Sequence, residues 1–319
     1  MKGLGNARAG VVVVDEGRAA QRVDNFLLRE LKGVPRSHVY RLLRGGEVRV
    51  NSRRVDATYR LQAGDRVRIP PVRTSAAPAR RPAPPRDPRF RIAFEDDALL
   101  VIDKPSGVAV HGGSGVSFGV IEQLRAARPE ARFLELAHRL DRETSGLLVL
   151  AKKRAALVAL HAALREGRVA KRYLALVKGA WARGPRTVEL PLRKRVTATG
   201  ARHVSVGAGG QSSRTDFRAV ERCGAFSLVE ATLATGRTHQ IRVHLAHLGF
   251  PIAGDDRYGD FELNRALAKR GLKRMFLHAH ALAFAHPLGA GRVALEAPLP
   301  DELAGFLATV RGPAHAEAV

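Results

Sequence analysis

The chain has 319 residues, of which 45% are hydrophobic, so it is long enough to bury a sizeable core in one or two domains. Its 54 Lys and Arg outnumber its 30 Asp and Glu, and the resulting net charge of +24 indicates a polyanionic partner, most often nucleic acid. A single cysteine, Cys223, excludes an intramolecular disulfide and a multi-cysteine zinc site. No apolar run approaches the roughly 20 residues of a membrane span, and none at the N-terminus matches a secretory signal. We therefore expect a cytoplasmic protein that does not associate with a membrane.

The N-terminal part of the chain predicts two short helices and a small sheet. Apolar residues from Val23 to Leu31 recur on one helical face. Ser37 is a suitable N-cap for a second helix, which Gly45–Gly46 would end. Two short strands of alternating pattern follow, with a turn at Asn51–Ser52 after the first: 48–50 and 67–69.

A spacer is predicted at residues 75–88, which are rich in Pro and Ala and show no apolar periodicity. Such a composition forms an extended linker rather than a folded element. It divides the chain into a small domain of residues 1–74 and a larger one of residues 89–319. Residues 1–74 carry 16 Lys and Arg against 7 Asp and Glu, a net charge of +9. This basic surface fits nucleic acid, and the alternative is a solvated basic face without a partner.

The larger part mixes strands and helices in a pattern typical of an α+β fold. Its strands follow one another as hairpin-like neighbours instead of alternating regularly with helices, so a mixed or antiparallel sheet is expected rather than a doubly wound one. We predict strands at 91–94, 99–102, 169–177 and 227–233, and helices at 154–165 and 238–249.

The most informative segment is HRLDRETSG at residues 138–146, which leads into the apolar run 147–151. It places Asp141 between Arg139 and Arg142 in a Ser/Gly turn before a buried strand. Cations that close favour the ionised form of a carboxylate. An ionised, oriented carboxylate beside arginines is a candidate nucleophile or base acting on an anionic substrate. The alternative is a turn or N-cap aspartate in a surface ion pair.

Three motifs in the larger part resemble those of the RluA-type RNA pseudouridine synthases. HRLDRETSG followed by LLVLAKK resembles the family's signature, KRYLALV at 171–177 resembles its second motif, and GRTHQIRVH at 236–244 resembles its third. The resemblance covers nearly the whole chain. It implies a long, bent, mainly antiparallel sheet with flanking helices and a basic cleft across its middle.

The resemblance also implies roles for four residues. Asp141 matches the family's catalytic residue, and Tyr173 matches the tyrosine that stacks on the uracil and is a candidate general base at C5. Arg237 matches the arginine paired with the catalytic carboxylate, and Arg139 matches the side chain that enters the space vacated by the flipped base. The alternatives are an ordinary strand aromatic for Tyr173, a phosphate contact for Arg237 and an ion-pair partner for Arg139.

Residues 22–67 resemble the S4 RNA-binding domain, in which a helix pair and a turn grip the RNA backbone. Arginines on a helix face and a tight turn can meet phosphates along one groove. The RNA-binding residues that we expect lie on the second helix and in the turn that follows it: Arg36, Ser37, Arg41, Arg44, Asn51, Arg53 and Arg54.

The implied reaction needs no cofactor, because turning uridine into its C-glycoside isomer gains and loses no atoms. The chain accordingly has neither a P-loop nor a dinucleotide-binding glycine motif. Two histidine groups could suggest a metal site, but they lack the acidic partner of a His-Glu-x-x-His site, so we interpret them as structural or RNA-facing and expect no metal. They are His239, His244 and His247, and His278, His280 and His286.

Two further segments, Lys171–Gly179 and Phe261–Leu282, resemble the C type of the family branch that modifies large-subunit (23S) ribosomal RNA. The D type of that branch, with a different 23S target, is the near alternative. We expect a monomer acting on specific uridines of 23S RNA, either naked or not yet in a finished subunit. A catalytically silent S4-type RNA-binding or ribosome-assembly factor and an RNA hydrolase are the opposing hypotheses. Whether Asp141 attacks C1′ or removes a sugar proton stays open.

Overall fold

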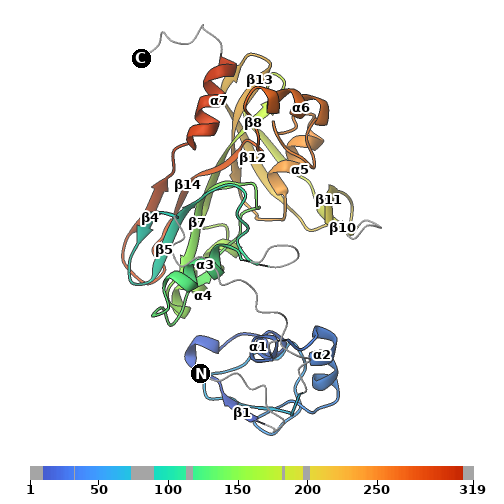
Figure 1. Ribbon diagram of the computed structural model, residues 1–319, viewed down its shortest axis with the longest axis vertical. Coiled ribbons are helices and arrows are strands. Elements are labelled where there is room, and N and C mark those ends of the chain that lie inside the picture. The colour runs from blue at the N-terminus through green and yellow to red at the C-terminus, as the bar shows by residue number, and fades with distance from the viewer. Residues whose placement is uncertain are drawn as a thin grey trace. The chain divides into compact units, whose positions relative to one another are not determined.

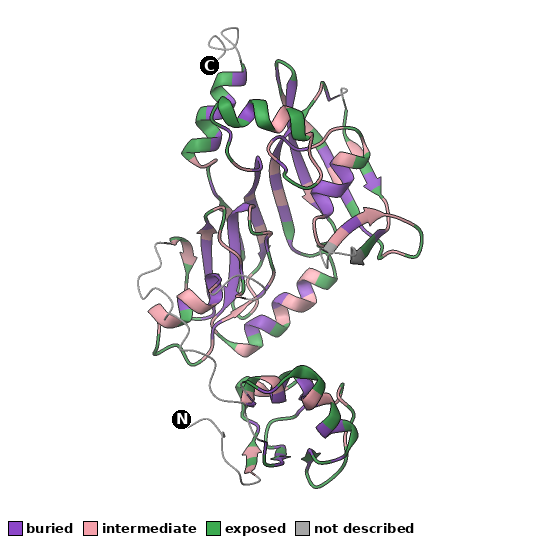
Figure 2. Ribbon diagram, turned by 45° about the vertical axis from the view of Figure 1, so that its right-hand side comes forward, coloured by how far each residue is buried: buried purple, intermediate pink, exposed green. Residues whose placement is uncertain are grey.

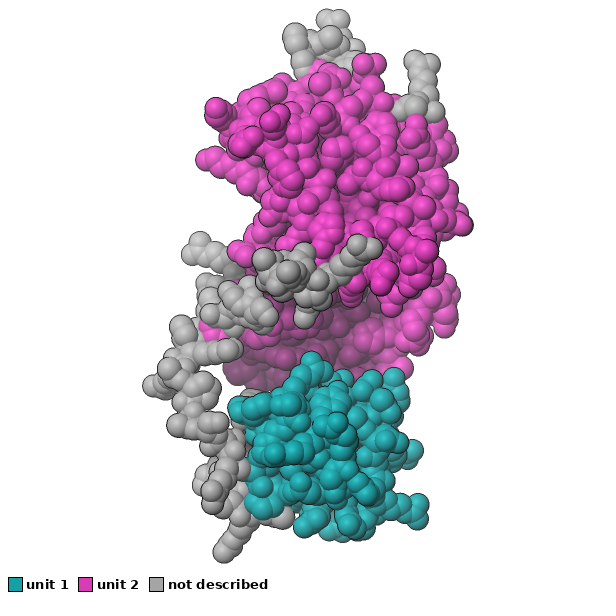
Figure 3. All heavy atoms as spheres, turned by 90° about the vertical axis from the view of Figure 1, so that its right-hand side faces the viewer, with its two compact units in different colours: residues 1–83 teal, residues 84–319 magenta. Residues whose placement is uncertain are grey.

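The computed structural model describes residues 10–31, 33–72, 90–112, 118–181, 184–196 and 202–311. The chain divides into two compact units, residues 1–83 and 84–319, which we call the N-terminal and C-terminal units (Figure 3). The linker predicted at 75–88 lies outside the described residues. The predicted domain limits, 1–74 and 89–319, therefore stay predictions.

The N-terminal unit consists of a helix pair and a small antiparallel sheet with strand order β1-β3-β2 (Figure 1). Its apolar core is formed by one face of each helix together with inward-facing strand residues such as Val50 and Val67. The predicted S4-like arrangement is thereby confirmed. The elements are β1 (Gly10–Val13), the short 3-10 helix η1 (Glu16–Arg18), α1 (Val23–Glu30), α2 (Arg36–Arg44), β2 (Arg49–Val50) and β3 (Arg66–Ile69).

The start of α2 differs from the prediction that Ser37 is its N-cap. The carbonyl of Pro35 accepts the first helical hydrogen bonds, from the amides of His38 and Val39 at 3.0 and 3.2 Å. Because the ring of proline holds its φ at a value suited to a helix start, the helix begins one residue before Ser37. Ser37 is therefore an exposed residue of the first turn and caps nothing.

The C-terminal unit is built on a sheet with the strand order β4-β5-β7-β14-β8-β13-β12-β9, with β15 added beside β14 and β6 beside β7. Its pairs are antiparallel except for the parallel pair β7–β14. The α+β fold with a mainly antiparallel sheet is confirmed. The strands of this sheet are β4 (Arg91–Glu95), β5 (Leu99–Lys104), β6 (Glu135–Leu136), β7 (Ser145–Ala151), β8 (Ala170–Lys178), β9 (Arg186–Glu189), β12 (Arg214–Cys223), β13 (Phe226–Leu233), β14 (Leu277–Ala285) and β15 (Arg292–Glu296).

Helices flank this sheet, and a separate antiparallel hairpin, β10 (Leu192–Val196) with β11 (Arg202–Val206), lies near α5 (Figure 1). None of the helices in the described parts of the chain is both long and apolar enough to cross a membrane. The helices are α3 (Val120–Ala127), α4 (Arg154–Arg165), α5 (Gln240–His247), α6 (Phe261–Lys269) and α7 (Asp301–Arg311).

The core of the C-terminal unit lies on both faces of the central strands. Every residue of β7 is buried, which explains its continuous apolar run, because a strand covered on both faces shows no alternation. Leu148 and Leu150 belong to one apolar cluster, and Leu147 and Val149 belong to the other. Figure 2 shows the central strands as buried and the helices as buried on one side. The loop that enters β7 is thus attached to a strand that is buried on both faces.

Candidate active site

A cavity of about 390 Å³ opens in the C-terminal unit, lined mainly by three segments distant in the sequence and also by Leu164, Arg165 and Leu277. The three segments are the loop 138–144 before β7, the start of β8, and residues 233–242 from the end of β13 into α5. These segments contain the three motifs that resemble the synthase family. The cavity therefore brings together Asp141, Tyr173, Arg237 and Arg139.

The loop that carries Asp141 is held in place by a close contact between two strands and by a turn within the loop. Gly146, at the start of β7, has a φ of +110°, and a Cβ there would lie 2.3 Å from the carbonyl oxygen of Ala279 on β14. Only glycine permits this close parallel pairing. Within the loop, the amide of Thr144 donates to the carbonyl of Asp141 at 3.2 Å, which closes a turn around the carboxylate residue.

A buried lysine, Lys104, also holds the loop that carries Asp141 in place. The Nζ of Lys104 donates to the carbonyls of Pro105 and Val108, both at 2.8 Å, and to that of Arg142 at 3.1 Å. Burial lowers the pKa of Lys104 to about 7. Because its ammonium joins the segment after β5 to the residue next to Asp141, Lys104 positions the loop that carries Asp141. The sequence analysis did not identify it.

The cation that faces Asp141 is Arg242, in the first turn of α5. Its Nη1 donates to Oδ2 of Asp141 at 3.4 Å, and the two side chains are 6% and 17% exposed. Its Nε and Nη2 donate to the two oxygens of Asp255, both at 2.7 Å, and Asp255 is 1% exposed. Burial alone would lower the pKa of Arg242, but the hydrogen bonds and charges of Asp255 and Asp141 raise it. Nη2 also lies 3.5 Å from Oδ1 of the exposed Asp256, so the guanidinium is a permanent cation with three carboxylates around it, of which Asp255 holds it most closely.

His239 completes the surroundings of the carboxylate. Its Nε2 lies 3.8 Å from Oδ2 of Asp141, and its Nδ1 lies 2.8 Å from the hydroxyl of Tyr258. That hydroxyl also accepts a hydrogen bond from the amide of Val204 at 3.1 Å, so the backbone fixes the position of Tyr258 and Tyr258 orients the imidazole. Burial lowers the pKa of His239 despite the charge of Asp141, so the imidazole is neutral at pH 7.

Arg237 does not make the contact expected of it. Its Nε donates to the carbonyl of Ser212 at 3.0 Å, and its side chain is exposed at the cavity wall. The expected pairing of Arg237 with Asp141 is therefore wrong, and Arg242 has that position. The reason is geometric, because Arg237 precedes α5, whereas Arg242 lies in the first turn of the helix and lines the cavity.

The flanking arginines of the motif are also not the partners of Asp141. Arg139 is exposed and lines the cavity. Arg142 points elsewhere, since its Nε donates to the carbonyl of Gly107 at 2.9 Å and lies 3.5 Å from Glu143. Residues 138–141 all line the cavity, whereas Arg142 points away from it.

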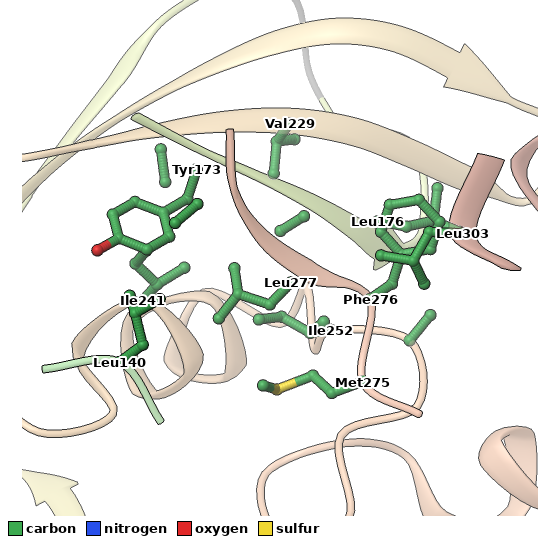
Figure 4. Packing of buried hydrophobic residues seen from close by; sticks show 14 of the residues in the cluster. Leu140, Tyr173, Leu176, Val229, Ile241, Ile252, Met275, Phe276, Leu277 and Leu303 are labelled. Atoms are coloured by element: carbon green, nitrogen blue, oxygen red, sulfur yellow. The ribbon is translucent and has the colours of Figure 1, made fainter. Parts of the chain in front are cut away.

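Tyr173 lies at the edge of the apolar core with its hydroxyl toward the cavity. It is 6% exposed and packs near Leu140 and Ile241, and Figure 4 shows its hydroxyl directed away from the other labelled core residues. Burial, together with the negative charge of Asp141, raises the pKa of Tyr173. Its phenol is therefore neutral at physiological pH and offers a flat apolar face to a ligand.

The histidines that suggested a metal have other partners. His244 lies between the hydroxyls of Ser213 and Thr215, at 3.0 and 2.9 Å. His278 lies 2.9 Å from the hydroxyl of Ser145 and 3.2 Å from the carbonyl of Ala297. In the described parts of the chain, no group of three His, Cys, Asp or Glu side chains is arranged to hold a metal ion.

The residues expected to bind RNA in the N-terminal unit are all exposed: Arg36, Ser37, Arg41, Arg44, Asn51, Arg53 and Arg54. Two of them also support the fold. Arg54 donates to the carbonyl of Arg44, and the Asn51 amide nitrogen donates to Asp65 at 2.7 Å. Asn51 and Ser52 both adopt left-handed conformations, with φ of 50° and 66°, as the predicted turn requires. Binding of RNA by these residues stays a prediction.

Comparison with known proteins agrees with this site. The family described as RNA pseudouridylate synthase matches residues 98–247, and the S4 domain family matches residues 21–67. Ribosomal large subunit pseudouridine synthase C from Salmonella typhimurium (strain LT2) and from Escherichia coli (strain K12) are each 53% identical to this chain over 308 residues. Each alignment covers 94% of this chain and 96% of the relative.

Two solved structures that resemble this chain also carry the name of this family. Human RNA pseudouridylate synthase domain containing 4 is 26% identical with a TM-score of 0.58, covering 69% of this chain and 93% of that one. Human RNA pseudouridylate synthase domain containing 1 is 29% identical with a TM-score of 0.56, covering 68% of this chain and 87% of that one. The chain therefore belongs to the RluA-type RNA pseudouridine synthases that carry an N-terminal S4 domain.

Proposed function

We propose that this protein isomerises specific uridines of 23S ribosomal RNA to pseudouridine, the reaction that the names of its bacterial relatives describe for those proteins. The observation that carries the proposal is the arrangement of Asp141, Arg242 and Tyr173 in one cavity. Five Lys or Arg line that cavity against a single carboxylate. A concave site with one reactive carboxylate and an excess of cations suits a nucleotide of a polyanionic RNA.

The reaction breaks the C1′–N1 bond, rotates the uracil, joins C5 to C1′, and moves a proton from C5 to N1. Asp141 is the group that reacts at the sugar, either by attack on C1′ or by removal of a sugar proton. Arg242 compensates its charge without occupying both of its oxygens. Of the two roles expected for Tyr173, stacking on the uracil is better supported, because its raised pKa disfavours the phenolate that a general base needs.

The target uridine must leave its helical stack to reach Asp141, which costs a few kcal/mol. Arg139 is exposed at the cavity wall, where its side chain is free to take the place of the flipped base in the RNA. The S4 domain adds a basic surface for the RNA around the target. We also propose that the enzyme is a monomer of the cytoplasm, of the C type rather than the D type, and that its substrate is RNA not yet in a finished subunit.

The proposal is tested by mapping pseudouridines in 23S RNA from a strain that lacks this gene. The wild-type gene and the matched control Asp97→Asn, an exposed aspartate in the β4–β5 turn, are expected to restore the missing sites. Asp141→Asn is expected to restore none, while the purified variant keeps its RNA affinity within a few-fold. Turnover by Asp141→Asn would exclude the catalytic assignment. Unchanged 23S RNA in the deletion strain would instead exclude the proposed substrate and favour a binding factor.

A further inference from the structure

The cavity contains a buried lysine that the reaction described above does not use. Lys171, at the start of β8, is 7% exposed and lines the cavity two residues before Tyr173. Within the part of the chain that the structure describes, its ammonium forms no hydrogen bond or ion pair. Trp181 Nε1 is the one fully buried side-chain nitrogen or oxygen without a hydrogen-bond partner among the described residues, so the Nζ of Lys171 is in contact with the open space of the cavity. A largely buried ammonium without a counter-ion is unfavourable, and a ligand in the cavity can supply the missing charge.

The other buried cations of this site show how Lys171 differs. Lys104 donates to three backbone carbonyls, and Arg242 is held by the two oxygens of Asp255. Burial lowers the pKa of Lys171, and no carboxylate opposes the effect of burial. Among the described residues that line the cavity, Asp141 is the one carboxylate, and it is already in contact with Arg242. Lys171 therefore has no counter-charge of its own in the cavity.

The ammonium of Lys171 faces the space that a nucleotide would occupy. Residues two apart on a strand point to the same face about 7 Å apart, so Lys171 and Tyr173 present their side chains side by side. A Cβ built on Gly236, across the cavity, would lie 3.9 Å from the Nζ of Lys171. The ammonium therefore lies close to the backbone of Gly236, and Lys171, Tyr173 and Gly236 all line the same cavity, which is where a ligand atom would meet the ammonium.

We propose that Lys171 binds the phosphate group of the nucleotide whose uracil stacks on Tyr173. Uracil is neutral and carries only carbonyl dipoles, whereas each RNA nucleotide contributes one full negative charge on its phosphate. A desolvated ammonium gains most from such a charge. The proposal deepens the proposed function, because it assigns a phosphate subsite next to the base subsite of the same cavity.

The test compares binding of uridine 5′-monophosphate with binding of uridine, by calorimetry or NMR titration, to three proteins. These are the wild-type protein, Lys171→Met, and the control Lys153→Met, which removes an exposed lysine. The wild type and the control are expected to bind the monophosphate at least roughly tenfold more tightly than uridine, the size of one charge-assisted hydrogen bond. Lys171→Met is expected to lose most of this preference and to keep its affinity for uridine. A preference that survives in Lys171→Met, or an equal loss for both ligands that indicates a contact to the base, would overturn the proposal.

Thermal unfolding of the same proteins without ligand gives an independent readout. Lys171→Met is expected to melt at the same temperature as the wild type or higher, because the substitution removes an unpaired buried charge. A lower melting temperature would show that the ammonium stabilises the fold, and would also overturn the proposal. Neither measurement requires turnover, so failure of the phosphate subsite is distinguishable from failure of the proposed pseudouridine formation.

Discussion

Replacing Arg242 by Gln tests the central electrostatic feature of the site. The guanidinium is 6% exposed and is shared by Asp141 and Asp255, of which Asp255 is 1% exposed. Removing one partner of a buried ion pair typically costs about 3–5 kcal/mol, because the remaining charge is left without compensation. For a unit of this size each kcal/mol shifts the melting temperature by about 2–4 °C, so we expect a decrease of about 6–20 °C.

The same substitution is expected to lower kcat/KM on a 23S RNA fragment by a factor on the order of 10² to 10³, the usual effect of removing one charge-stabilising group from an active site. The assay is single-turnover pseudouridine formation between pH 5 and 9, with melting curves recorded in parallel.

The matched control is Arg237→Gln, in the same motif. Arg237 is exposed and donates only to the carbonyl of Ser212, so its loss is expected to change stability by less than about 0.5 kcal/mol. The two variants thus separate the arginine that the sequence favoured from the one that the structure places at Asp141. If Arg237→Gln melts far below the wild type and Arg242→Gln does not, the corrected pairing is refuted.

Two further predictions concern the S4 domain and the pH dependence of stability. Deleting residues 1–74 is expected to weaken RNA binding more than it slows the reaction at saturating RNA. Each lost phosphate contact lowers the slope of the logarithm of the binding constant against the logarithm of the salt concentration by roughly 0.9 if the RNA is duplex. A truncated protein that keeps its full affinity and slope would exclude RNA binding by the S4 domain. Burial lowers the pKa of His278 to about 4 from its ordinary value of 6.5, so the unfolded chain binds its proton first and stability falls as the pH drops from 6.5 to 4. That loss amounts to about 3 kcal/mol, and melting curves of His278→Gln over this range should show a shallower dependence than those of the wild type.

Local patterns predicted part of the secondary structure, and they did not indicate β1, β6, β9, β10, β11, β12, β14, β15, α3, α6 or α7. Each strand and helix expected from periodicity is present, with limits that differ by a few residues, because the apolar spacing determines which face is buried. The start of α2 was missed since Ser37 is a good cap by composition, whereas the structure uses the carbonyl of Pro35. The parallel pairing of β7 with β14 joins His278 to Ser145, 133 residues earlier in the chain, and no local pattern indicates it.

The motifs identified residues that line the cavity, but not which of their side chains contact one another. Asp141, Tyr173 and Arg237 do lie around one space, as their resemblance to the family implied. The choice between Arg237 and Arg242 depends on where α5 begins, and His239, with a φ of 55°, turns the chain sharply at that point. A left-handed residue other than glycine is rarely evident from sequence. Residues such as Asp255 act through contacts that only the folded chain creates.

The hydrogen bonds between Arg242 and Asp255 explain why the contact between Arg242 and Asp141 is long. An arginine facing a single carboxylate tends to bind both of its oxygens through two parallel hydrogen bonds. In this site Nε and Nη2 of Arg242 are already taken by Asp255 at 2.7 Å, so only Nη1 reaches Asp141, at the longer distance of 3.4 Å. The charge of Asp141 is compensated while one of its oxygens stays free of the guanidinium. By holding Arg242 in this orientation, the buried Asp255 leaves Asp141 with lone pairs available for the sugar, which the proposed reaction requires of it.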